Sequence, residues 1–206
     1  MSKWIRRGVL PGVCLLALAA AGCGDLVRQG HGPNLGMVTL LEGASGATPG
    51  EFGGTLSSDV ITYVERDING ATVQVPTVFA DVGRATVSVE MKDPATAPTT
   101  INTVTFTRYR VEFFRADGRN TPGVDVPYGF DSAVTFSAAP GDPGTAGFEL
   151  IRHTTKTEAP LVALANNLQF ITAIARVTFY GTDHAGNDVT AVGQIGVTFG
   201  NFGDPE

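Results

Sequence analysis

The chain has 206 residues, with 20 Asp and Glu against 14 Lys and Arg, a formal net charge of −6 and only two cysteines. This length fits one domain, or at most two, whose core is large enough to need no disulfide. The acidic balance excludes nucleic acid and an anionic membrane surface as expected partners, because both need clustered positive charge.

The N-terminal segment has the pattern of a secretory signal. Residues 1–8 carry three basic side chains and no acid, and residues 9–21 are almost wholly apolar. The apolar run is too short for a membrane-spanning helix, which needs about 20 residues. It ends in Ala20-Ala-Gly-Cys23, which resembles the lipobox of bacterial lipoproteins.

This resemblance implies that residues 1–22 are a removable signal and that Cys23 is lipidated on sulfur and acylated on its new amine. Two or more acyl chains hold a protein stably on a membrane. The mature part would keep 184 residues and a formal charge of −9. Gly24 after the Cys, by the same resemblance, favours the outer membrane over the inner one. The alternative is an ordinary secretory signal in which Cys23 is incidental.

The segment after Cys23 is rich in glycine and poor in apolar residues. Eight glycines lie between residues 25 and 57, with 37–41 as the only apolar island. Such sequence buries too little surface to offset its ordering entropy, so 23–57 is predicted to be a flexible tether. The alternative for residues 37–41 is an edge strand.

Short strand patterns bounded by turn residues recur from residue 58 to the end. The clearest alternates Ala85, Val87 and Val89 with polar residues, which is typical of a strand with one buried face. The expected strands are 59–64, 84–92, 104–114, 133–137, 146–152 and two more in 170–199. In 104–114 the apolar parity changes, which predicts a bulge near Thr107–Arg108. A short helical segment of one or two turns is expected within 158–168.

The last two strands form a predicted antiparallel hairpin. Two β-branched and aromatic runs in 170–199 flank an Asp/Gly/Asn cluster. The first run is apolar on both faces, which predicts a central strand covered on both sides, and the second is apolar on one face. The fold class expected for 58–206 is all-β, a two-sheet antiparallel sandwich of seven to eight strands.

The loop of this hairpin, Thr182-Asp-His-Ala-Gly-Asn187, resembles the loop that joins the last two strands of bacterial immunoglobulin-like and fibronectin-III-like modules. The segment 164–170 has the spacing of the corner that precedes the penultimate strand in those modules, with Phe170 where Tyr is usual. The resemblance implies an immunoglobulin-like sandwich, and it says more about fold than function.

Some modules with this loop bind calcium, so the resemblance implies Asp183 as a ligand, with Asn187 or Asp188 assisting. Calcium takes six to eight oxygens. The candidates for the remaining ligands are Asp81, Asp125, Asp131 and Asp142. The alternative is turn chemistry, in which Asp and Asn side chains cap the turn and Gly186 supplies a positive φ.

A long loop, 121–130, carries the aromatic residues Tyr128 and Phe130 and is the first candidate for a binding surface. The alternative is that both rings fold back onto the sandwich as a lid.

Motifs for catalysis are absent from the sequence. The three histidines are far apart, and no zinc spacing, nucleophile elbow, phosphate loop or dinucleotide fingerprint occurs. The function predicted is therefore a lipid-anchored, extracytoplasmic, non-catalytic β-sandwich that mediates protein contacts in the bacterial envelope or on the cell surface. A carbohydrate- or small-ligand-binding module, with calcium as a possible cofactor, is the alternative.

Overall fold

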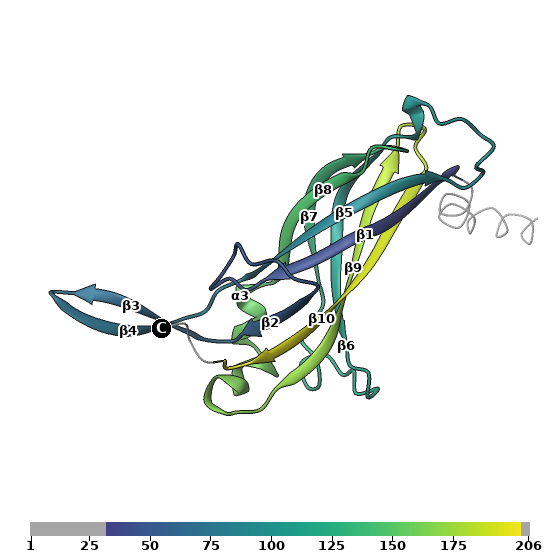
Figure 1. Cartoon of the computed structure of the whole chain (residues 1–206). Coiled ribbons are helices and arrows are strands. Elements are labelled where there is room, and N and C mark those ends of the chain that lie inside the picture. The colour runs from purple at the N-terminus through teal and green to yellow at the C-terminus, as the bar shows by residue number, and fades with distance from the viewer. Residues whose placement is uncertain (1–31, 203–206) are drawn as a thin grey trace, which may run out of the picture.

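The computed structural model describes residues 32–202, and most of this part of the chain is β-structure, which confirms the all-β class (Figure 1). Its ten strands are β1 (Asn34–Ala44), β2 (Thr55–Asp59), β3 (Thr62–Ile68), β4 (Ala71–Thr77), β5 (Asp81–Met91), β6 (Val104–Phe114), β7 (Phe130–Ala138), β8 (Gly144–Ile151), β9 (Ile171–Asp183) and β10 (Asp188–Gly200). One short helix, α3 (His153–Thr157), and two 3-10 turns, η1 (Thr100–Asn102) and η2 (Leu161–Asn166), lie between strands. There are more strands than expected because 59–64 divides between β2 and β3, β4 follows, and β1 lies in the predicted tether.

The strands form three sheets. A five-stranded sheet has the order β2-β10-β9-β6-β7, a three-stranded sheet has the order β1-β5-β8, and β3 pairs with β4 alone. All pairings are antiparallel except that of β2 with β10. Buried side chains from both larger sheets form one hydrophobic core, so the body is sandwich-like.

Aromatic rings join the two larger sheets. Phe179 on β9 is fully buried and lies edge-on to Phe148 on β8, with ring centroids 5.4 Å apart. Tyr109 on β6 packs against the same Phe148 ring at 5.1 Å, and its hydroxyl donates a 3.0 Å hydrogen bond to the Glu149 carbonyl. Such edge-to-face pairs add to the free energy of burial, so this cluster holds the sheets together.

The predicted tether is wrong from Asn34 onward, because β1 pairs along its length with β5 and forms the edge of the three-stranded sheet. The glycines there serve close packing. A Cβ on Gly36 would lie 2.9 Å from the Thr190 carbonyl oxygen of β10, and one on Gly193 would lie 2.9 Å from Val38 Cγ1 of β1. Glycine in a strand marks such close approach of two backbones. Residues 23–31 lie outside the described part of the chain.

The bulge predicted in β6 is confirmed. The register of β6 with both β7 and β9 shifts between Phe106 and Arg108, and the buried positions change parity from Val104 and Phe106 to Tyr109 and Val111. The extra residue returns the apolar side chains of both halves to the core face.

The hairpin of β9 and β10 is confirmed, and β9 is the middle strand of the five. The expectation that β9 is covered on both faces is wrong: Ile174 is 37% exposed on its outer face. Arginines cover the other aromatic rings there, with Arg108 over Tyr180 and Arg176 over Phe114. These two rings are therefore covered by cations of their own sheet, while Ile174 remains partly exposed to solvent.

The β3–β4 hairpin projects from the body of the molecule (Figure 1). Asn69 and Gly70 both have positive φ, +58° and +82°, which gives the tight two-residue turn that matches strand twist. Its strand residues are mostly exposed.

Truncation of the ring at the centre of the core should be severe. For Phe179→Ala we expect a loss of about 3–5 kcal/mol in the free energy of unfolding, measured by urea denaturation, because a fully buried ring leaves a cavity. Val192→Ala on the neighbouring strand, 50% exposed, is the matched control and should change it by less than about 0.5 kcal/mol. Equal losses for the two variants would contradict the assigned role of Phe179.

Candidate functional site

The loop between β6 and β7 lies at one end of the domain. In the pairing of β6 with β9, Val104 faces Asp183 and Phe114 faces Ile174. The chain after Phe114 therefore leaves at the end opposite the β9–β10 turn, as Figure 1 shows. We name residues 115–129 the distal loop.

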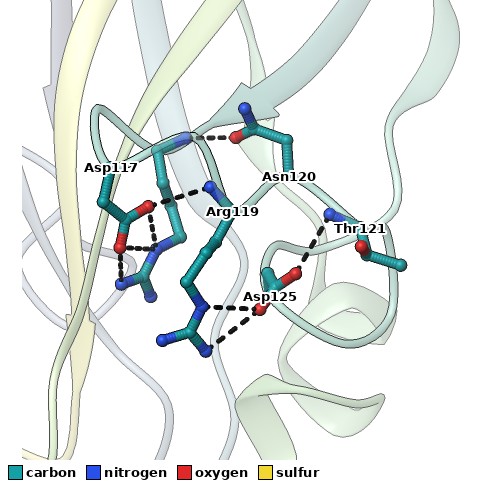
Figure 2. Close-up of polar contacts among 6 residues, drawn as sticks. Asp117, Arg119, Asn120, Thr121 and Asp125 are labelled. Carbon is teal, nitrogen blue, oxygen red and sulfur yellow. Dashed lines mark hydrogen bonds and ion pairs between the residues drawn. The ribbon is translucent and has the colours of Figure 1, made fainter.

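Charged side chains order the first half of the distal loop (Figure 2). Arg115 donates to both oxygens of Asp117, at 3.1 Å from Nε and 2.5 Å from Nη2. Arg119 contacts Asp125 Oδ1 from Nε at 3.1 Å and from Nη2 at 3.0 Å. The Asn120 side chain accepts a 2.7 Å bond from the Arg115 backbone N–H. The two arginines and two aspartates thus neutralise one another within the loop.

These contacts lower the pKa of both carboxyl groups, Asp117 and Asp125. Hydrogen bonds from the Arg115 guanidinium, and then from the Arg119 backbone N–H, lower the pKa of Asp117 to about 2. Desolvation would raise the pKa of Asp125, but hydrogen bonds from Arg119 and Thr121 outweigh it and lower that pKa. Both carboxylates are therefore charged and paired at neutral pH.

Backbone bonds fix the second half of the distal loop. The N–H groups of Val124 and Asp125 donate to the Thr121 carbonyl at 3.1 and 2.8 Å, and Gly123 N–H donates to Val126 O at 2.8 Å. Gly123 has a φ of +77°, which a side chain would strain. Val126 is 1% exposed and inserts into the core. The loop is thus a folded element with one apolar plug.

The two aromatic residues that were predicted to bind a partner, Tyr128 and Phe130, differ in their exposure to solvent. Tyr128 is 56% exposed, with its ring against Gly123, as expected of a contact residue. Phe130 is the first residue of β7 and is buried, packed edge-on to Tyr109 and covered by the Arg152 guanidinium. Its selection as a binding residue is therefore wrong, because the pairing of β7 with β6 turns it inward. Val124, in the same loop as Tyr128, is 67% exposed.

A second surface feature is a depression of about 310 Å³ on the outer face of the five-stranded sheet. Arg108, Tyr180, Asp188 and the threonines of neighbouring strands line it. Arg108 stacks on Tyr180 at 4.0 Å and forms a 2.9 Å ion pair with Asp131. The depression is polar and small for a ligand pocket.

Asp183 serves the β9–β10 turn. Its Oδ1 accepts the backbone N–H groups of Ala185 and Asn187 at 3.0 and 2.8 Å, and Gly186 has a φ of +86°. Its Oδ2 accepts from Asn34 Nδ2 at 2.9 Å, and the Asn34 amide oxygen accepts from Asn102 Nδ2 at 3.2 Å. This is the turn chemistry described above, extended into a polar clamp of Asn34, Asn102 and Asp183.

The other calcium candidates do not form a cation site with Asp183. Asn187 donates its side-chain amide to the Asp183 carboxylate, and Asp188 lines the outer depression. Asp125 and Asp131 contact arginines, Asp81 contacts a lysine, and Asp142 lies in the turn after β7. Within residues 32–202, no group of three or more His, Cys, Asp or Glu side chains is placed to hold a metal ion.

The structure contains a buried ion pair, between Lys156 and Asp81, that the sequence analysis did not predict. Lys156 Nζ on α3 lies 2.7 Å from Asp81 Oδ1 at the start of β5, with the two side chains 1% and 0% exposed. Desolvation lowers the pKa of Lys156, and the Asp81 carboxylate opposes that shift. A signal for Asp81 existed, because it shares parity with the buried residues Ala85 and Val87. Nothing around Lys156 marks it as buried.

Comparisons with known proteins identify no relative: no family model matches the chain, and neither a curated protein nor a solved structure is significantly similar to it. Among the helices of residues 32–202, none has the length and apolarity needed to cross a membrane.

The Arg115–Asp117 pair gives a prediction on pH. The folded pKa of Asp117 lies below its ordinary value of 3.8, so the pair is fully formed above pH 3.8 and is lost as the pH falls through about 2. A carboxyl-detected NMR titration should show the Asp117 midpoint near 2, and Arg115→Gln should move it toward 3.8. A wild-type midpoint already near 3.8 would contradict the paired loop.

Proposed function

We propose that this protein is a lipid-anchored, extracytoplasmic, non-catalytic β-domain that contacts another protein of the bacterial envelope or cell surface through the distal loop. The observation that carries the proposal is the ordered distal loop, which presents Tyr128 and Val124 to solvent after neutralising its own charges.

The fold assigned within this proposal is an immunoglobulin-like sandwich. Two facing sheets, antiparallel neighbours and a terminal hairpin with the Asp183–Asn187 turn support it. The extra strands β3 and β4 form a separate sheet outside the two that enclose the core.

The distal loop has the anatomy of a protein contact. Interfaces are enriched in Tyr, and binding energy concentrates in a few aromatic and Arg residues. A rigid loop loses little conformational entropy on binding, and the exposed Tyr128 ring then adds affinity. Since Arg115 and Arg119 are already paired, we expect a partner that packs against apolar surface rather than one that supplies charge.

The position of the start of β1 supports a lipid anchor at the end of the domain opposite the distal loop. Cys23 precedes β1, and β1 starts at Asn34 in the polar clamp, at the end of the domain opposite the distal loop. With lipid on Cys23, the membrane would lie on the side of the clamp and the distal loop would face away from it. A loop in that position is accessible to a partner.

The alternative function is binding of a carbohydrate or small polar ligand at the outer depression. Arg108, Tyr180 and Asp188 offer a planar ring and charged groups there. Ligand-dependent stabilisation of the protein would favour this function, since a ligand that binds only the folded state raises Tm.

Anchoring gives a direct prediction. Cys23→Ser removes the sulfur that would carry lipid, so the protein should move from the membrane fraction to the soluble fraction on cell fractionation. Cys14→Ser, which alters the other cysteine within the signal, should leave the distribution unchanged. Retention of Cys23→Ser on the membrane would refute lipid anchoring.

The contact surface gives another prediction. Tyr128→Ala should reduce cross-linking to the envelope partner about tenfold or more, because loss of an interface hot spot costs about 2 kcal/mol. Tyr63→Ala, a tyrosine of the β3–β4 hairpin that is 43% exposed, is the matched control and should keep the cross-link. If both variants cross-link like the wild type, the distal loop is not the contact surface.

A further inference from the structure

The buried pair of Lys156 and Asp81 serves neither the distal loop nor the anchor. It joins α3 to the start of β5, 75 residues apart in the chain, with Nζ and Oδ1 2.7 Å apart. Both side chains are almost completely excluded from solvent. Burying two charges costs several kcal/mol per ion, and their attraction offsets this only in favourable geometry.

The surroundings hold both reacting groups in fixed positions. The Asp81 carboxylate accepts two further donors: Gly46 N–H reaches Oδ1, the oxygen that contacts Lys156, at 2.9 Å, and Ser58 Oγ reaches Oδ2 at 2.6 Å. Lys156 Nζ also donates to the Asp59 backbone carbonyl at 2.7 Å, which fixes the direction of the amine. The carboxyl group is therefore polarised by donors and faces an amine that cannot turn away.

In such a dry site a proton can pass from Nζ to Oδ1, which replaces two buried charges by a neutral amine and a neutral acid. Desolvation, which lowers the pKa of Lys156, favours this transfer. A desolvated lysine amine is a nucleophile, and an acid held beside it is its electrophile. The two groups are then the reactants of an amide.

We propose that Lys156 and Asp81 join in an intramolecular isopeptide bond between Nζ and Cγ. The amine nitrogen attacks Cγ, and the developing negative charge on Oδ2 is stabilised by the Ser58 hydroxyl. The new C–N bond forms as the bond from Cγ to Oδ1 breaks. Oδ1 leaves as water, with one proton from the amine and one from the acid, so no oxidant or reductant is consumed.

The fixed orientation of the two groups and the exclusion of water both favour the isopeptide bond between Lys156 and Asp81. Well-oriented groups react as if at effective concentrations of about 10⁵–10⁸ M. A water-excluded site also protects the amide from hydrolysis. The bond would tie α3 to β5 covalently in a chain that has only two cysteines, and it is independent of the proposed function.

The bond can be tested by tryptic mapping of the denatured full chain. Acylation of Nζ blocks cleavage after Lys156, so we expect a branched peptide of residues 67–84 and 153–176 whose mass is the sum of the two less one water. Complete cleavage after Lys156, with 67–84 and 153–156 recovered as separate linear peptides, would overturn the proposal.

Variants identify the partner groups. Lys92→Met removes a lysine outside the site and should leave the branched peptide intact, whereas Lys156→Met should abolish it and lower Tm. If a branched peptide containing 67–84 persists in Lys156→Met, the bond assigned here is wrong. The wild-type map decides the question even if Lys156→Met fails to fold.

Discussion

The contact between Phe179, Phe148 and Tyr109 is the interaction on which the rest of the molecule depends. These rings belong to β9, β8 and β6, so they hold the two larger sheets face to face. Because Phe179 lies on the middle strand of five, its position fixes its neighbours on both sides. This ring cluster fixes the positions of the strands, and the strands in turn position the turns and loops at both ends of the domain. The function that we propose therefore depends on the side chains that those loops expose.

Two clusters of buried polar side chains lie at the ends of the hydrophobic core. At one end the clamp of Asn34, Asn102 and Asp183 ties the start of β1 to the β9–β10 turn and to η1. Near the other end of β5, Asp81 receives donors from Lys156, Gly46 and Ser58. Every buried side-chain nitrogen or oxygen in residues 32–202 has a hydrogen-bond partner. Polar groups satisfied in this way rigidify and specify a fold.

The sequence predicts the parts of this structure that follow from local pattern. Parity located the bulge in β6, and the Asp183–Asn187 cluster marked the last hairpin. Patterns of that kind could not show that Gly36 and Gly193 bring β1 against β10, because glycine indicates flexibility and close packing equally. Asn69-Gly70 was a hairpin signal that the prediction overlooked, since 59–64 was assigned as a single strand. The burial of Phe130 and Lys156 depends on contacts between distant segments, which no local pattern records.

The lipid anchor and the contact role of the distal loop that we propose would give this β-domain a simple mode of action, in which the fold holds a small apolar surface in a fixed position. That claim requires the loop to be ordered before any partner binds. Hydrogen–deuterium exchange on the full chain tests it most directly, because the amides of Gly123, Val124 and Asp125 are hydrogen-bonded within the loop. We expect them to exchange more slowly than the amide of Asn69 in the exposed β3–β4 turn, and the β9 amides to be slowest of all. Exchange of the loop amides at the rate of an unstructured chain would contradict a preformed contact surface.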